Sequence, residues 1–87
     1  MKSIEDWITI ITDMIRNDMN VEITLDRIDA DTELGDVGLG LDSLKLIELA
    51  VRLEQNFQIS VPDEELPRLG GYAFGRFIKE YMGHKEP

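Results

Sequence analysis

The sequence contains no cysteine, so it can form no disulfide bond and no cysteine-based zinc site, and it offers no thiolate nucleophile. A small domain without disulfides is typical of the cytoplasm, where we expect this protein to work. Long apolar runs are also lacking, so we expect no membrane span. The first residues, which include Glu5 and Asp6, lack the basic start and apolar stretch of a secretory signal.

Basic residues are scarce as well. The chain has 9 Lys and Arg against 18 Asp and Glu, which gives a net charge of −9. This charge repels nucleic acid and anionic membrane surfaces and attracts basic patches on proteins, although acidity also serves solubility alone. We therefore expect no nucleic acid partner. The length predicts a single domain over residues 1–87, with a flexible tail at 83–87, and we expect a monomer.

The first helix is predicted from Ser3 to about Met19, where apolar residues recur at helical spacing. Ser3 and Asp6 resemble a capping box with aspartate in place of the usual glutamate. Trp7 falls on the apolar face of this helix. We interpret it as an anchor in the core or at its rim, not as a platform for a ligand.

A long connection follows, from about Val21 to Leu41. Connections of this length are uncommon in small domains and are often functional. We expect its apolar residues to pin it to the core; these are Ile23, Leu25, Ile28 and Leu34. We expect its acidic residues to face water; these are Asp26, Asp29, Asp31, Glu33 and Asp36. The acids do not form an EF-hand loop, because Gly40 stands where a bidentate acid is required. We interpret them as a solvated loop and predict no metal site.

The second helix is predicted from about Ser43 to Phe57. Its core face is apolar at helical spacing, and it carries a second, adjacent apolar strip that the core does not require. The strip consists of Leu44, Ile47 and Val51, with Lys45, Glu48 and Arg52 beside it. An apolar strip edged by charges is what a transient docking surface needs. As an alternative, Leu44 and Ile47 cover the preceding loop, and the two cations simply pair with Glu48.

The C-terminal part of the chain predicts a short helical turn over Pro62–Leu66, which Pro67 ends. Gly70-Gly71 then breaks the chain, and a last helix runs from about Tyr72 to Met82. Gly75 inside this helix indicates either a close helix contact or room for a ligand. Together the elements predict an all-α, small antiparallel four-helix bundle of three longer helices and one short helix, with the long loop between helices 1 and 2.

The segment from Gly38 to Leu44 places a serine on the first turn of a helix. Its glycines allow a tight turn, and Asp42 is positioned to cap the helix that begins at Ser43. The run from Leu39 to Leu49 resembles the phosphopantetheine attachment site of acyl carrier proteins, and the resemblance extends from about Thr32 to Leu66.

The resemblance implies that a phosphopantetheinyl transferase attaches 4'-phosphopantetheine from coenzyme A to Ser43. The thiol of this arm then holds acyl groups as thioesters for acyl-activating, condensing and other acyl-processing enzymes. In such a carrier a cavity between the helices would shelter the acyl chain, but we assign most of the residues that could line it to the core. These are Leu46, Leu49, Leu53, Phe57, Ile59, Leu66, Leu69 and Phe74.

The resulting hypothesis is a stand-alone, non-catalytic acyl carrier protein for fatty-acid, polyketide or related specialised biosynthesis. Lys45 stands where fatty-acid carriers often have an acid, and together with Arg52 it favours a specialised pathway. One alternative is an acidic helical adaptor without an arm. Another is an aminoacyl or peptidyl carrier, but peptidyl carriers usually lack the aspartate that stands here as Asp42. A serine hydrolase is disfavoured, because the single histidine, His84, lies in the tail and the motif lacks the Gly-x-Ser-x-Gly elbow.

Overall fold

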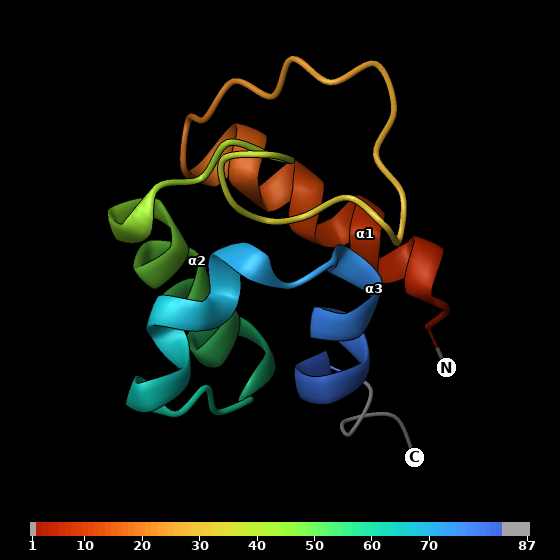
Figure 1. The fold of residues 1–87 in the computed structure, drawn as a ribbon. Coiled ribbons are helices and arrows are strands. Elements are labelled where there is room, and N and C mark those ends of the chain that lie inside the picture. Colours follow the sequence, from red (N-terminus) through yellow and green to blue (C-terminus); the bar gives the residue numbers. More distant parts are fainter. Residues whose placement is uncertain (1, 83–87) are drawn as a thin grey trace.

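The computed structural model describes residues 2–82, and the predicted tail at 83–87, with His84, lies outside them. The described residues contain four helical segments, and a long connection joins the first two (Figure 1). They are α1 (Ile4–Asp13) continued by η1 (Met14–Asp18), then α2 (Ser43–Phe57), then η2 (Asp63–Gly71), and last α3 (Phe74–Phe77) continued by η3 (Ile78–Met82). Residues 2–82 contain no strand beyond one isolated antiparallel bridge between Glu33 and Ala73. The predicted all-α class is confirmed.

The first helix begins as its sequence predicts. The Ser3 N–H donates to the Asp6 carboxylate and the Asp6 N–H donates to the Ser3 hydroxyl, each over 3.1 Å, so the capping box is formed. Trp7 is buried and meets the ring of Phe57 edge-on, with 5.1 Å between the ring centroids. The last turn of this helix widens into the π-helix η1, which ends at Asp18.

The core gathers apolar residues from every helical segment. The fully buried ones include Ile11, Ile15, Leu49, Leu53, Leu69, Phe74, Phe77 and Met82. Leu25 was expected to pin the long connection to this core, and that expectation is wrong, because its side chain is 36% exposed. Here the connection arches away from α1 before it turns back toward α2 (Figure 1). Ile23 and Leu34 are buried as predicted, and Leu39 and Leu41, later in the connection, are buried as well.

Residues 30–35 of the connection lie antiparallel to residues 70–75, just before and at the start of α3. Four backbone hydrogen bonds of 2.8–3.1 Å join the two segments. The N–H groups of Leu34, Gly35, Phe74 and Gly75 donate to the carbonyls of Tyr72, Gly70, Thr32 and Ala30, respectively. The last helix was predicted to start at Tyr72 and starts at Phe74 instead, because the residues before it pair with the connection. Glu33, expected to face water, is half-buried for the same reason.

Two glycines allow this close pairing. A Cβ atom on Gly35 would lie 2.7 Å from the carbonyl oxygen of Gly70, and one on Gly75 would lie 2.9 Å from the Cβ of Ala30. Gly75 therefore allows close contact with the connection. The sequence predicts close contact with another helix or room for a ligand at this position, and the structure places the connection there instead. A Cβ on Gly71, by contrast, would meet nothing within 4 Å.

Two boundaries predicted in the C-terminal part are wrong. Pro67 does not end a short helix and Gly70-Gly71 does not break the chain, because both lie inside the 3-10 helix η2. Proline's fixed φ near −65° suits 3-10 geometry, and the exposed Pro67 clashes with nothing in the core. The helix in this region, η2, is consequently longer than the predicted Pro62–Leu66.

We expect Gly35→Ala to lower the free energy of unfolding by about 1–3 kcal/mol, because the added methyl group would push the two paired segments apart. Urea unfolding followed by circular dichroism measures this change. Gly71→Ala is the matched control and should unfold like the parent, since its methyl group enters open space. Equal stability of the two variants would show that the pairing tolerates a wider separation.

Candidate functional site

Ser43 is the first residue of α2, and Asp42 caps the helix in front of it. The Asp42 Oδ1 atom accepts a hydrogen bond from the Lys45 N–H over 2.9 Å, and the Asp42 carbonyl accepts from the Leu46 N–H over 2.9 Å. The predicted cap is therefore confirmed, as are the predicted bounds of this helix. Ser43 itself is exposed, so its hydroxyl is presented at the surface on a rigid first turn.

The turn that leads into Ser43 is held by its backbone. The carbonyl of Gly35 accepts hydrogen bonds from the N–H groups of both Gly38 and Gly40, over 3.0 and 2.8 Å. Gly40 has a φ of +84°, a conformation that L side chains rarely adopt. Leu39 and Leu41 are buried on either side of it and fix the turn to the core. The position of Ser43 thus depends on the same Gly35 that contacts Gly70.

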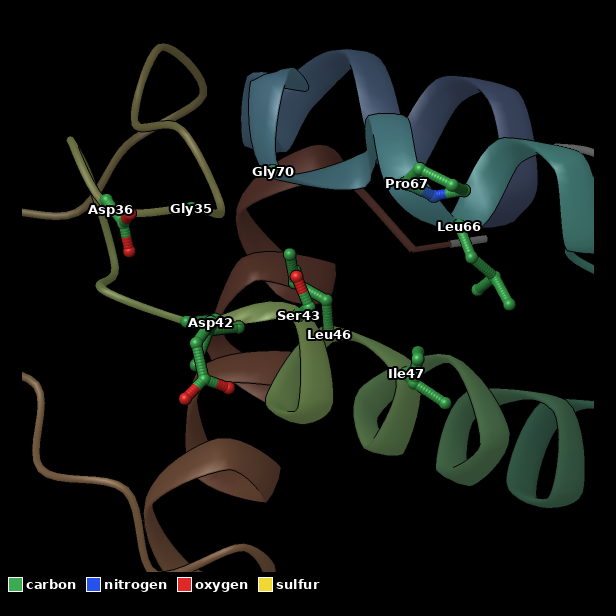
Figure 2. Close-up of a pocket in the computed structure, with 10 residues that line it drawn as sticks. Gly35, Asp36, Asp42, Ser43, Leu46, Ile47, Leu66, Pro67 and Gly70 are labelled. Atoms are coloured by element: carbon green, nitrogen blue, oxygen red, sulfur yellow. The ribbon is translucent and has the colours of Figure 1, made fainter.

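A pocket of about 450 Å³ opens beside Ser43 (Figure 2). Three segments form its walls: the turn before α2, the first two turns of α2, and η2. Figure 2 shows Leu66 reaching from η2 toward α2, where Leu46 and Ile47 lie. The pocket is lined by Gly35, Asp36, Leu41, Asp42, Ser43, Leu46, Ile47, Leu66, Pro67 and Gly70. It combines an apolar side with carboxylates near its edge.

This pocket differs from the cavity between the helices that we considered from the sequence. Of the eight apolar residues weighed for such a cavity, Leu46 and Leu66 line the pocket, whereas Leu49, Leu53, Leu69 and Phe74 are packed in the core. Sequence reasoning missed the contribution of Pro67 and Gly70, which it took as signals that end helices. The adjacent glycines were nevertheless a usable signal, since glycine also marks close backbone approach.

The second apolar strip of α2 is exposed next to this pocket. Leu44, Ile47 and Val51 are 77%, 42% and 44% exposed. Leu44 therefore does not cover the loop, and the three residues of the strip form part of the surface. It continues directly from Ser43 along the helix.

Glu48 pairs with both cations beside the strip. The Lys45 Nζ atom lies 3.7 Å from one of its carboxylate oxygens, and the Arg52 guanidinium lies 3.1 Å from the other. All three side chains are partly exposed, so each pair contributes only about 0.2–0.5 kcal/mol to the helix. The edge of the strip thus carries one net positive charge on an acidic protein.

The described part of the chain contains no cluster of three or more carboxylates, histidines or cysteines arranged to hold a metal ion. None of the helices between residues 2 and 82 combines the length and apolar character needed to cross a membrane.

Comparison with known proteins places this site inside a matching region. The family model described as "Phosphopantetheine attachment site" matches residues 9–71, which include Ser43 and every residue that lines the pocket. An acyl carrier protein of Akkermansia muciniphila is 44% identical over 48 residues. This match spans 55% of the chain and 59% of the relative. No solved structure matches the chain significantly.

We expect Asp42→Ala to lower the free energy of unfolding by about 0.5–2 kcal/mol, because it leaves the Lys45 N–H without its cap. Asp42→Asn is the matched control and should lose less, since asparagine caps helices comparably. Urea unfolding of both variants measures the difference. An equal loss in the two would show that the charge of Asp42, not its cap bond, supports the helix.

Proposed function

Because the chain belongs to the phosphopantetheine attachment site family, as its resemblance to acyl carrier proteins predicted, we propose that Ser43 carries 4'-phosphopantetheine and that the chain is an acyl carrier protein. The observation that carries this proposal is the exposed Ser43, fixed on a capped first turn beside an open pocket. The arm, donated from coenzyme A, supplies a thiol that forms thioesters with acyl groups.

The residues around Ser43 fit such an arm. The hydroxyl stands at the N-terminus of a helix of 15 residues, where the helix dipole favours the negative charge of a phosphodiester. Figure 2 shows the Ser43 side chain directed toward η2 and the Asp42 carboxylate directed away from it. Leu46, Ile47 and Leu66 offer an apolar surface within reach of an attached group.

We propose that the protein acts as a carrier in the cytoplasm and not as a catalyst. Its partners would be a phosphopantetheinyl transferase and the acyl-activating, condensing and other acyl-processing enzymes that receive its cargo. The cargo would be an intermediate of fatty-acid, polyketide or related specialised biosynthesis. An adaptor that carries no arm is the alternative from a different class, and modification of Ser43 separates the two.

The exposed strip of α2 is our candidate for the surface that these enzymes recognise. Leu44, Ile47 and Val51 supply apolar contact next to Ser43, and the charges beside them supply selectivity. Lys45 and Arg52 both pair with Glu48, as the alternative interpretation predicts, but the three side chains together still carry one net positive charge, and Lys45 stands where fatty-acid carriers often have an acid. A cognate enzyme should accordingly carry an acid opposite this edge.

Ser43→Ala should abolish attachment of the arm and leave the helical circular dichroism spectrum unchanged, because an exposed hydroxyl is not part of the core. The measurement is intact-mass spectrometry after incubation with coenzyme A and a broad-specificity phosphopantetheinyl transferase. Ser60→Ala, which removes another exposed hydroxyl, is the matched control and should be modified like the parent. An arm found on Ser43→Ala at another residue, or none on the parent, would refute the assignment.

Charge reversal at Lys45→Glu with Arg52→Glu should weaken binding to the cognate enzyme by about tenfold at low salt, and improve binding to a housekeeping fatty-acid enzyme. The effect should shrink as salt is added, because exposed charges are screened. Binding is measured on the arm-bearing protein. Arg16→Glu with Lys79→Glu makes the same change of charge at exposed positions elsewhere and serves as the control. Equal affinities of both double variants would place selectivity outside this edge.

A further inference from the structure

Helix η2 forms the side of the pocket that faces α2. The hydrogen bonds within η2 stabilise it only weakly. It is a 3-10 helix of nine residues, whereas such helices rarely exceed three or four, because their hydrogen-bond geometry is poor. Pro67 lies inside it and has no N–H to donate. Its position therefore depends on contacts made from outside the helix.

Besides the burial of Leu69 in the core, three hydrogen-bonding contacts hold η2. Just before its start, the Glu54 carboxylate of α2 accepts a hydrogen bond from the Val61 N–H over 2.9 Å. At its end, the Gly70 carbonyl accepts from the Gly35 N–H over 3.0 Å. Between them lies Glu65, whose neighbours Leu66 and Pro67 line the pocket.

Glu65 joins the middle of η2 to Tyr72, which directly follows the end of η2, and to Tyr81 of η3. Its Oε1 atom accepts a hydrogen bond from the Tyr72 hydroxyl over 2.9 Å, and the Tyr81 hydroxyl lies 3.5 Å from the same atom. Hydrogen bonds to a carboxylate are about twice as strong as those between neutral groups. The Arg68 guanidinium, 3.8 Å from the other oxygen, belongs to η2 itself and does not anchor the helix to anything else.

The Tyr72 hydroxyl is a fixed donor. Its side chain is 6% exposed and lies under the Arg76 guanidinium, 4.5 Å from the ring centroid. Arg76 in turn pairs with Glu80 over 3.3 Å, and Glu80 also approaches the hydroxyl, at 3.2 Å. Burial and the bond to Glu65 raise the pKa of Tyr72 well above its ordinary value, so the hydroxyl stays protonated. The Tyr72 hydroxyl has one proton to donate, and of its two carboxylate neighbours Glu65 is closer than Glu80.

We propose that Glu65 is a positioning residue for the pocket: held by Tyr72, it fixes η2 and thereby limits the size of the acyl group that fits beside Ser43. A long acyl group requires η2 to move outward, which breaks the bond between Glu65 and Tyr72, whereas a short group does not. This inference rests on the proposed carrier function.

The test compares Glu65→Ala and Tyr72→Phe with the parent. Glu64→Ala is the matched control, because Glu64 is the exposed neighbouring carboxylate on the same helix. Glu65→Gln keeps an oxygen that can accept from Tyr72 but loses the charge, so it should fall between the parent and Glu65→Ala. Circular dichroism verifies that each variant is folded.

The first readout needs no arm. Amide hydrogen exchange over residues 66–71 should be about tenfold faster in Glu65→Ala and Tyr72→Phe than in Glu64→Ala. The loss of one charge-assisted hydrogen bond shifts the equilibrium for local opening by about this factor.

The second readout uses the protein loaded with straight-chain acyl groups of increasing length. We measure thioester cleavage by hydroxylamine and take the ratio of the rates for the longest and shortest groups. In Glu65→Ala and Tyr72→Phe this ratio should fall by about tenfold, because the freed wall shelters the long group. General loosening of the fold would change both rates together and leave their ratio unaltered.

Exchange like that of Glu64→Ala, or a ratio equal to the parent's, overturns the proposal. If the parent accepts no arm, the carrier function fails instead, and the exchange measurement still decides whether Glu65 holds η2.

Discussion

The backbone pairing of residues 30–35 with residues 70–75 is the constraint on which the rest of the structure depends. It holds because Gly35 and Gly70 bring their backbones into direct contact, with no side chain between them. The Gly35 carbonyl then organises the turn into Ser43, and Gly70 lies in the last turn of η2, the helix that walls the pocket. A single contact between two glycines therefore places both the serine and the opposite side of its pocket.

The two sides of the pocket are supported in different ways. On one side α2 is a regular helix with a side-chain cap, packed on the core through Leu49 and Leu53, so the serine has a defined position. On the other side η2 depends on hydrogen bonds from neighbouring segments. Such an arrangement pairs a serine in a defined position with a wall that is held from outside its own helix, which suits the proposed role of a carrier that must hold and release its cargo.

Features set by neighbours in sequence could be predicted, and those set by distant segments could not. The Ser3–Asp6 capping box, the Asp42 cap and the bounds of α2 follow from signals within a few residues, and all three are confirmed. The start of α3 and the exposure of Leu25 depend on where the connection lies. Local propensity gives no information on that, because the pairing joins residues some forty positions apart. For the same reason, the serine was predicted and most of the pocket around it was not.

The long-range pairing also has a consequence for biosynthesis of the chain. The turn before Ser43 is locked only when its partner segment is present, and that segment lies near the C-terminal end of the described residues. During translation, Ser43 leaves the ribosome well before residues 70–75, and closing so long a loop is a late step in folding. A nascent chain therefore displays Ser43 on an unsettled turn, and the complete surface around this serine forms only after residues 70–75 have also emerged.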